Sequence, residues 1–185
     1  MTNQLRKHLR YKFINKIFYL RNKLRFGYLG KNVFFDSNVE FLRFNKNLVV
    51  FDNVIFKSGA KISCCNKGAQ IIIGENTTIG YNTFIFSSKS IEIGKDCMIS
   101  SFAYLVDSTH GIRKGFKMNE QKETANKIKI GDDVWIGQGS TILSGVEIGD
   151  GSIVGAGSVV NQSIGSNKIY AGNPAREIGN RNWWK

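Results

Sequence analysis

The sequence predicts an all-β fold in which three short strands make one coil and successive coils stack on one another. The main observation is a six-residue period: five triplets place an aliphatic or aromatic residue at every sixth position, so that each triplet defines a unit of 18 residues. A second observation is that glycine often follows this residue, and a small or β-branched residue comes four positions after it. Neither a helical period nor a long alternation fits this pattern, whereas an internal repeat fixes the architecture directly. The fifteen periodic positions are Val50, Phe56, Ile62, Ile73, Ile79, Ile85, Ile93, Ile99, Leu105, Ile130, Ile136, Ile142, Ile148, Val154 and Val160.

The chemistry of the repeat suits a narrow tube. The large side chain fills the axis, the small one fits near a corner, and glycine tolerates the turn. Three hexads then form one coil, and each coil contacts only its neighbours. The step from Ile130 to Ile148 is 18 residues, whereas the step from Ile93 to Ile130 is 37, so 19 residues are in excess. This excess predicts an extruded loop at about residues 107–129.

A chain of 185 residues fits one domain with appendages. We expect a basic amphipathic segment at 1–32, a coiled domain at 33–172 and a tail at 173–185. Val33 and Val39 predict a degraded opening coil that caps the stack. The pair Asn173-Pro174 predicts a turn out of the last coil and into a short C-terminal helix.

The net charge of +12 is concentrated at the N-terminus. Residues 1–32 hold nine Lys or Arg and no acidic residue, while the rest of the chain is nearly balanced. Apolar residues recur there at roughly helical spacing, which predicts an amphipathic helix. Either residues 1–28 lie on an anionic membrane surface, or the helix packs on its own coils with its charges in water. No recognition motif accompanies the charge, so a nucleic-acid partner is not expected. The apolar positions are Leu5, Leu9, Phe13, Ile17 and Leu24.

Several classes of protein are disfavoured by composition. The three cysteines, Cys64, Cys65 and Cys97, are odd in number and lack a C-x-x-C, so neither a disulfide framework nor a zinc site is expected. Cys97 occupies a small-residue position of the repeat, which indicates a packing role. A reducing cytoplasm is the simplest location. Neither a transmembrane stretch nor a signal peptide is recognised.

Three segments carry a resemblance to a known family: "IGENTTIGYNTFI", "IGDDVWIGQGSTILSGVEIGDGSIVGAGSVV" and "YAGNPAREIG". They resemble the hexapeptide-repeat acyltransferases, and most of all the branch of sugar and polysaccharide O-acetyltransferases, over roughly residues 33–180. The resemblance implies a left-handed parallel β-helix, acetyl-CoA as acyl donor with no metal, and a homotrimer with active sites between neighbouring subunits. A cytoplasmic enzyme is expected from the cysteines, and the basic N-terminus allows a peripheral position on the inner face of the membrane.

The candidate catalytic residue is His110, at the root of the predicted loop. A neutral imidazole is a suitable base for a hydroxyl proton near neutral pH, and the family places its catalytic histidine at this kind of position. The alternative is a solvated loop histidine. Asp107, three residues earlier, either orients the imidazole or forms the turn at the coil corner.

Candidate coenzyme-binding residues follow from the resemblance. Trp135 matches a tryptophan beside the coenzyme in relatives, with packing in the core or between coils as the alternative. Gln138 and Ala156 match coenzyme-contacting positions. Arg176 matches a basic position near the coenzyme phosphates, although a solvated terminal arginine is the alternative. The Thr-Lys pair that often follows "GAGSVV" in the family is replaced by Asn161-Gln162, so one lysine contact is absent there.

The sequence therefore favours an acetyl-CoA-dependent O-acetyltransferase that acts on a sugar or glycan acceptor in surface-polysaccharide or glycoconjugate biosynthesis. The first alternative is an N-acetyltransferase of a nucleotide-linked amino sugar, and no glycine-rich βαβ pattern for an added nucleotide domain is present. A zinc enzyme of the carbonic-anhydrase type is disfavoured, because the chain has two histidines. A non-catalytic β-helix scaffold is an alternative of another class.

Overall fold

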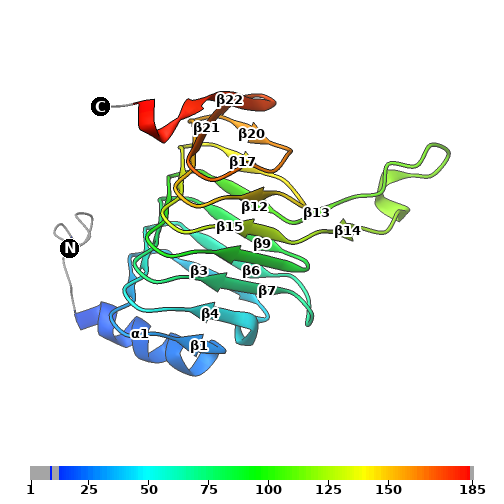
Figure 1. Ribbon diagram of the computed structural model, residues 1–185. Helices are drawn as coiled ribbons and strands as arrows, with labels where there is room; N and C mark the ends of the chain where they lie inside the picture. The colour runs from blue at the N-terminus through cyan, green and yellow to red at the C-terminus, as the bar shows by residue number, and fades with distance from the viewer. Residues whose placement is uncertain (1–8, 10–12, 184–185) are drawn as a thin grey trace.

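The strands of the chain wind into a parallel β-helix with three flat faces (Figure 1). The computed structural model describes residues 9 and 13–183. Over these residues each face is a parallel sheet to which every coil adds one strand. The first sheet holds β1 (Tyr28–Leu29), β4 (Leu48–Val50), β7 (Gln70–Ile73), β10 (Ser90–Ile93), β15 (Ile128–Ile130) and β18 (Glu147–Ile148). The second holds β2 (Phe34–Phe35), β5 (Ile55–Phe56), β8 (Thr78–Ile79), β11 (Met98–Ile99), β16 (Trp135–Ile136), β19 (Ile153–Val154), β21 (Lys168–Gly172) and β22 (Ala175–Asn180). The third holds β3 (Glu40–Arg43), β6 (Lys61–Cys64), β9 (Phe84–Ser87), β12 (Tyr104–Val106), β17 (Thr141–Ile142) and β20 (Val159–Val160).

The six-residue period sets the register of these sheets. Ile73 pairs with Ile93, Ile93 with Ile130, and Ile130 with Ile148, so residues of one period position stack directly along the axis. All fifteen periodic side chains are buried, and they form one continuous core. The predicted architecture of stacked three-strand coils is confirmed. The hydrophobic effect drives it, because a single coil has no other apolar surface on which to bury these side chains.

The corners need residues that tolerate the left-handed backbone region. Asn76 (φ 59°), Asn82 (φ 53°) and Asp133 (φ 56°) take this conformation, as do Gly139 (φ 68°) and Gly151 (φ 69°). Asn, Asp and Gly are the residues for which this region costs least. Their recurrence explains how the chain can turn sharply at the corners of successive coils.

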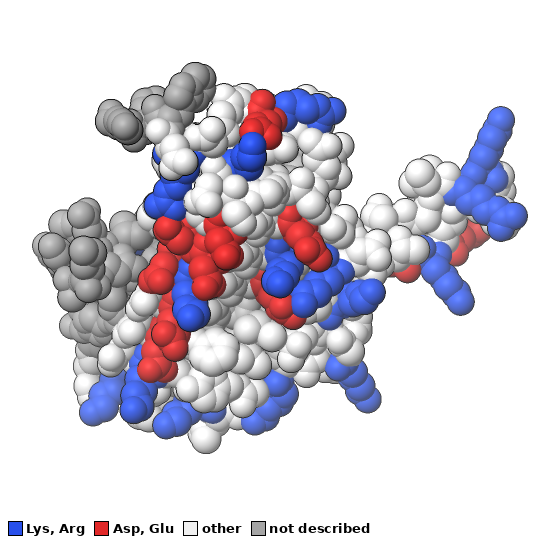
Figure 2. All heavy atoms as spheres, viewed as in Figure 1, with Lys and Arg blue, Asp and Glu red and all other residues white. Residues whose placement is uncertain are grey.

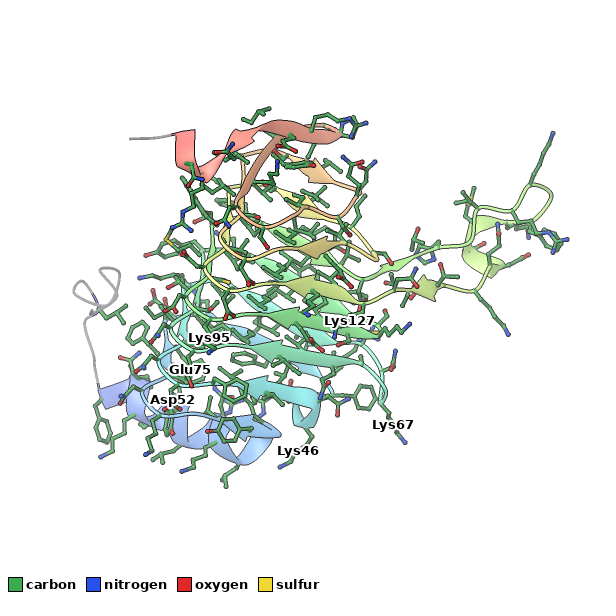
Figure 3. The ribbon with its side chains drawn as sticks, in the orientation of Figure 1. Lys46, Asp52, Lys67, Glu75, Lys95 and Lys127 are labelled. Carbon is green, nitrogen blue, oxygen red and sulfur yellow. The ribbon has the colours of Figure 1, made fainter. Side chains whose placement is uncertain are left out.

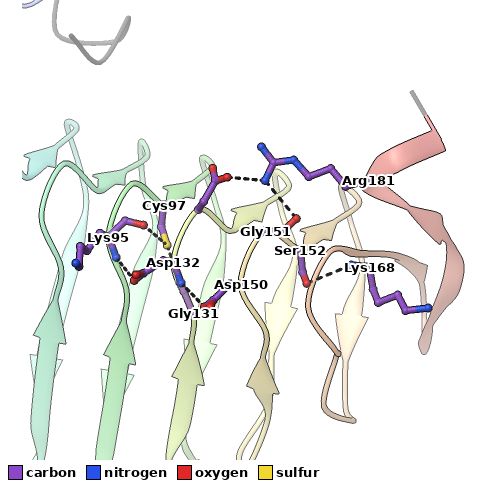
Figure 4. A network of polar contacts seen from close by, with 10 residues as sticks. Lys95, Cys97, Gly131, Asp132, Asp150, Gly151, Ser152, Lys168 and Arg181 are labelled. Carbon is purple, nitrogen blue, oxygen red and sulfur yellow. Dashed lines mark hydrogen bonds and ion pairs between the residues drawn. The ribbon is translucent and has the colours of Figure 1, made fainter. Parts of the chain in front are cut away.

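One edge of the stack is a row of charged corners (Figure 2). In Figure 3, Asp52, Glu75 and Lys95 follow one another along this edge, one from each successive coil. Further up, the Lys95 N–H donates to Oδ1 of Asp132 at 2.8 Å, and the Asp132 N–H donates to Oδ1 of Asp150 at 2.8 Å (Figure 4). Each carboxylate thus accepts a backbone N–H from the coil below, so the side chains fasten neighbouring corners together.

The opening coil begins earlier than the sequence interpretation placed it. Its periodic, inward residues are Leu29, Phe35 and Phe41, whereas Val33 and Val39 occupy the small-residue positions of the same hexads. The β-helix therefore starts at β1, inside the segment 1–32 that was expected to precede it. The bulky rings fill the end of the tube, and Phe35 stacks on Phe56 of the next coil with ring centroids 5.4 Å apart.

The extruded loop is present as an arm that projects from the body (Figure 1). Two short antiparallel strands form its base, β13 (Ser108–Thr109) and β14 (Thr124–Ala125), and a 3-10 turn, Met118–Glu120, lies further out. The Asn126 N–H donates to the Asp107 carbonyl at 2.9 Å and closes the base. The arm ends at residue 127, because β15 begins at Ile128.

The C-terminal segment differs from the expected helix. After the cis peptide Asn173-Pro174 the chain reverses, and β22 pairs antiparallel with β21. Helical structure is limited to the 3-10 turn Arg181–Trp183. Arg181 of this turn forms an ion pair with Asp133 at 2.5 Å and holds the hairpin against the corner (Figure 4).

The N-terminal helix α1 (Phe13–Arg25) lies across the first coil, next to β1 and β2 (Figure 1). Of the predicted apolar positions, Leu5 falls outside the described residues. No helix in the described part of the chain is both long and apolar enough to cross a membrane.

Candidate active site

A groove of about 610 Å³ runs along the second sheet, across several coils, and is the candidate ligand site. Its walls come from the outward side chains of β8, β11 and β16 and from the corners that follow them. The lining is mostly apolar, with a few polar groups at fixed positions, which is the composition of small-molecule sites. The lining includes Lys57, Thr78, Tyr81, Ser100, Trp135, Gln138 and Ala156.

Trp135 is the central wall of this groove. It directly precedes the periodic residue Ile136, so its side chain points outward, and 45% of it is exposed. The indole N–H donates to Oγ of Ser100 at 3.0 Å, which fixes the ring against the coil below. Met98, its neighbour across the ladder, is also exposed. This exposure excludes packing inside the core, whereas the bond to Ser100 is a contact between coils, which stays an alternative for Trp135.

Gln138 and Ala156 lie beside Trp135 in the same groove, on successive coils. Both are exposed at the corner between the second and third sheets, and the Gly157 N–H donates to the Gln138 carbonyl at 2.8 Å. The stacking of coils thus brings Ala156 beside Trp135 and Gln138, which belong to the preceding coil. Of the four expected coenzyme contacts, these three share one site.

Arg176 lies outside the groove but on the same sheet. It sits on β22, opposite Ala171 of β21, two strands beyond β19. Its side chain is exposed, and one Nη donates to the carbonyl of Ala175 at 2.9 Å. The guanidinium remains open to a ligand that follows the sheet toward its end, as the resemblance requires.

The other end of the groove holds groups that the sequence interpretation missed. Thr78 is buried, and its hydroxyl has no hydrogen-bond partner among the described residues. Lys57 places its ammonium 5.8 Å from the ring centroid of the exposed Tyr81. An orphaned hydroxyl beside a cation and an aromatic ring is suited to a polar ligand. Their periodic spacing was visible in the sequence, but no motif marked them.

His110 lies on the arm, directly after β13. Its side chain is 66% exposed, and Nε2 is 3.7 Å from Oε1 of Glu123. The antiparallel pairing of Thr109 with Thr124 explains why His110 and Glu123 are close. His110 follows Thr109 and Glu123 precedes Thr124, so the two lie opposite each other. Glu123 is therefore the carboxylate near the imidazole. The sequence could not reveal it, since the register of the arm is not encoded in the six-residue period.

Asp107 does not contact His110. It is fully buried, and its oxygens accept hydrogen bonds from the Ser87 hydroxyl and from the backbone N–H groups of Ser88, Lys89 and Ser90, at 2.6–2.9 Å. The Asp107 carboxylate therefore organises the turn between β9 and β10 of the preceding coil. The orienting role considered for Asp107 is not supported, and the turn-forming alternative fits its contacts.

The described chain keeps the arm and the groove apart. None of the residues that line the groove belongs to the arm. The arm leaves the corner between the third and first sheets, whereas the groove follows the second sheet. A reaction that needs both His110 and the groove must therefore join two copies of the chain or move the arm.

The cysteines are structural. All three are free, and Cys97 is buried with its backbone N–H donating to Oγ1 of Thr77 at 3.1 Å. Burial raises the pKa of the Cys64 thiol to about 12 and that of Cys97 to about 11. The packing role predicted for Cys97 agrees with these contacts. Across residues 9 and 13–183, no group of three or more His, Cys, Asp or Glu side chains is arranged to hold a metal ion.

Two repeat families match the coils of this β-helix. The family described as "Bacterial transferase hexapeptide (six repeats)" matches residues 127–162, and that described as "Hexapeptide repeat of succinyl-transferase" matches residues 70–101. The first match covers strands β15 to β20 and includes Trp135, Gln138 and Ala156. The coils are therefore hexapeptide repeats.

Relatives of known name lead to the same family. A Dictyostelium discoideum protein inferred to be an acetyltransferase is 46% identical over 111 residues, 60% of this chain and 58% of that protein. The polysialic acid O-acetyltransferase of Escherichia coli O1:K1 / APEC is 42% identical over 60% of this chain and 37% of its own length. The galactoside O-acetyltransferase of Escherichia coli K12 is 35% identical over 60% of this chain and 54% of that enzyme. The chain thus spans well under two thirds of these relatives.

Solved structures extend the likeness over most of the chain. AntD, an N-acyltransferase from Bacillus cereus solved with dTDP and 3-hydroxybutyryl-CoA, superposes with a TM-score of 0.76 at 25% identity, over 88% of this chain and 87% of AntD. A galactoside acetyltransferase in complex with coenzyme A superposes with a TM-score of 0.68 at 28% identity, over 95% of this chain and 74% of that one. Together with the repeat matches, these findings show that the chain is similar to hexapeptide-repeat acyltransferases over most of its length.

Proposed function

We propose that the chain is an acetyl-CoA-dependent O-acetyltransferase that acts on a sugar hydroxyl, with His110 as general base. The observation that carries this proposal is the groove in which Trp135, Gln138 and Ala156 meet. Residues matched to the coenzyme contacts of the family share one open site, and a CoA complex exists for a structural relative. The cytoplasm, where acetyl-CoA is available, is the corresponding location.

The direction of the coenzyme follows from the charges along the sheet. Arg176 stands beyond the groove toward the C-terminal end, and a guanidinium suits phosphate oxygens. We place the nucleotide phosphates there and the pantetheine beside Trp135. The thioester then lies toward Thr78, whose unpartnered hydroxyl can donate to a pantetheine amide or to the acceptor.

A homotrimer brings the base to this groove. Because the arm of one chain reaches away from its own body, a neighbour related by rotation about an axis parallel to the β-helix can receive His110 beside Trp135. Closed ring symmetry repeats the same contact three times. Each of three sites would then combine the groove of one subunit with the arm of the next.

The chemistry is a direct transfer. The imidazole of His110 takes the proton of the sugar hydroxyl while the hydroxyl oxygen attacks the thioester carbonyl carbon. The tetrahedral intermediate then collapses, the C–S bond breaks, and the proton passes from the imidazolium to the departing CoA thiolate. The Glu123 carboxylate, 3.7 Å from the imidazole, favours the imidazolium while it exists. Such general-base help is typically worth about 100- to 10,000-fold.

The acceptor is a sugar or glycan of surface-polysaccharide or related biosynthesis. This part of the proposal is supported by the named activities of the two Escherichia coli O-acetyltransferases. Lys57 and Tyr81, at the acceptor side of the groove, provide a cation and an aromatic face for a sugar that carries negative charge.

The test separates binding from turnover. His110→Ala should lower acetyl transfer by about 100-fold or more and leave the affinity for acetyl-CoA, measured by calorimetry, unchanged. Trp135→Ala should weaken that affinity. Lys117→Ala, an exposed change on the same arm, is the control for His110. Full activity of His110→Ala would refute the base, and absence of acetyl-CoA binding by the wild type would return the non-catalytic scaffold as the better explanation.

An N-acyltransferase of a nucleotide-linked amino sugar is the second candidate. AntD favours it, since that N-acyltransferase covers this chain almost completely and was solved with dTDP. Matched acceptors decide between the two: transfer to a sugar hydroxyl supports the O-acetyltransferase, and exclusive transfer to the corresponding amine supports the N-acyltransferase.

A further inference from the structure

Helix α1 is attached to the β-helix by a mixed face, on which Phe18 and Tyr19 pack against the core beside polar anchors. The Asn15 side chain donates to the carbonyl of Phe35 at 2.7 Å, and the Tyr19 hydroxyl donates to the carbonyl of Gly30 at 3.0 Å. Asn22, one turn further along the same face, is buried. At the C-terminus of the helix, the ammonium of Lys46 donates to the Leu24 carbonyl at 3.0 Å. These contacts fix which face of α1 turns outward.

The outward face is the apolar one. Phe13, Ile17, Leu20 and Leu24 recur three or four residues apart, so they form one stripe along the helix. Their exposed fractions are 78%, 44%, 53% and 80%. A helix of a soluble domain normally turns such a stripe toward the core. Here these four side chains face outward although Phe18 faces the core, and a continuous apolar surface of this kind is typical of an interaction site.

The stripe is bordered by cations on both sides. Lys16 and Lys23 flank one side of the helix and Arg21 the other, as their positions in the helical period require. The first acidic residue of the whole chain is Asp36, beyond the helix. In Figure 2 this end of the molecule accordingly displays basic and uncharged side chains. An apolar centre with basic borders matches the boundary between acyl chains and anionic headgroups.

We propose that α1 docks the protein on an anionic membrane surface, with the stripe in the acyl-chain boundary and Lys16, Arg21 and Lys23 at the phosphates. A second copy of the chain is a poorer occupant, because two such faces would bring like charges together without an acidic partner. The contacts of α1 with its own coils support one of the two interpretations of the N-terminal segment, and membrane contact is the proposal. The helix does pack on its own coils, and it does so in a way that frees its apolar face.

The position of α1 suits this role. It lies across the end of the stack, at the opposite end from the β21–β22 hairpin (Figure 1). On the proposed trimer, three such helices would face the same way, and their simultaneous contact would strengthen a weak individual one. This last point rests on the proposed oligomer, whereas the surface of a single chain carries the docking itself.

The experiment is sedimentation of the full-length chain with vesicles of phosphatidylcholine alone or of phosphatidylcholine mixed with phosphatidylglycerol. We expect binding to the anionic vesicles that weakens with salt. The double charge reversal Lys16→Glu/Lys23→Glu should reduce it by about thirty-fold or more, which corresponds to about 1 kcal/mol for each cation lost. The matched reversal Lys67→Glu/Lys89→Glu, on exposed lysines away from α1, should leave most of the binding intact.

A second pair of variants tests the apolar stripe. Ile17→Gln/Leu20→Gln should reduce vesicle binding about tenfold or more, whereas Ile112→Gln/Ile178→Gln, at exposed positions elsewhere, should not. Equal binding by the α1 variants and the wild type, or no binding of the wild type to anionic vesicles, would overturn the proposal. If the wild type forms a larger assembly in solution and the Ile17→Gln/Leu20→Gln variant does not, the apolar stripe would instead bind a second copy of the chain. None of these outcomes depends on acetyl transfer.

Discussion

Replacement of Asp107 gives the sharpest test of how the arm is joined to the β-helix. Its carboxylate accepts four hydrogen bonds from the preceding coil, three of them at a single oxygen, Oδ2. Asp107→Ala removes all four acceptors at a fully buried position. At about 1 kcal/mol for each bond, the cost is about 4 kcal/mol in the free energy of unfolding. An asparagine that keeps its oxygen at the Oδ2 position loses only the Ser88 bond, so it should cost about 1 to 2 kcal/mol.

The assay is urea unfolding followed by tryptophan fluorescence, at one protein concentration so that any oligomer contributes equally. Glu40→Ala is the control, since it breaks an exposed 3.2 Å pair with Lys61 and should change stability by at most about 1 kcal/mol. A cost for Asp107→Ala no greater than that of the control would refute the structural role. So would an alanine variant that unfolds normally but alters only the pH dependence of turnover, which is the behaviour expected of an orienting residue.

Three further predictions concern the arm, the thiols and the core. Glu123→Gln should lower turnover by about tenfold or less while acetyl-CoA binding is kept, because screening weakens an exposed pair with His110; an unchanged turnover would remove Glu123 from the mechanism. The pKa values of Cys64 and Cys97 are raised above 9.0 by burial, so the folded state binds more protons than the unfolded state as pH rises above about 9. Unfolding by urea should therefore become easier from about pH 9 toward pH 11 to 12, and alanine at both positions should flatten this slope. Ile85→Ala should cost about 2 to 5 kcal/mol and Ile85→Val about 1 kcal/mol, since Ile85 is fully buried on the axis; a similar cost for both would contradict the packing described.

The coils could be predicted from the sequence because one physical requirement recurs at every sixth residue. The period located the core from Val50 to Val160, and the excess between Ile93 and Ile130 located the arm. The six-residue period gave the wrong inward residues for the first coil. Val33 and Val39 were predicted there, whereas the inward residues are Leu29, Phe35 and Phe41. At an open end the axis must be filled by large rings, and the β-branched pattern of the interior no longer applies.

The candidate site was predictable from the sequence only for residues whose relative positions are set by the stacking of coils. Trp135, Gln138 and Ala156 meet because each follows from the same register. The partner of His110 depends on the strand pairing within the arm, and the contacts of Asp107 depend on its burial. The six-residue period predicts neither of these. For α1 the sequence predicted a helix but not its docked face, because short polar side chains can anchor a helix to exposed carbonyls as firmly as apolar ones.

The C-terminal hairpin also determines how long the solenoid can become. A parallel sheet that ended at β19 or β21 would offer its hydrogen-bonding edge to a strand of another molecule in the same orientation, and coils could then continue from chain to chain into a filament. Because β22 runs antiparallel, its free edge presents a different spacing of N–H and C=O groups, with Arg176 and Glu177 on it. On this sheet an incoming parallel strand therefore finds no matching template. The reversal at Pro174 thus hinders the continuation of the second sheet from one chain into another.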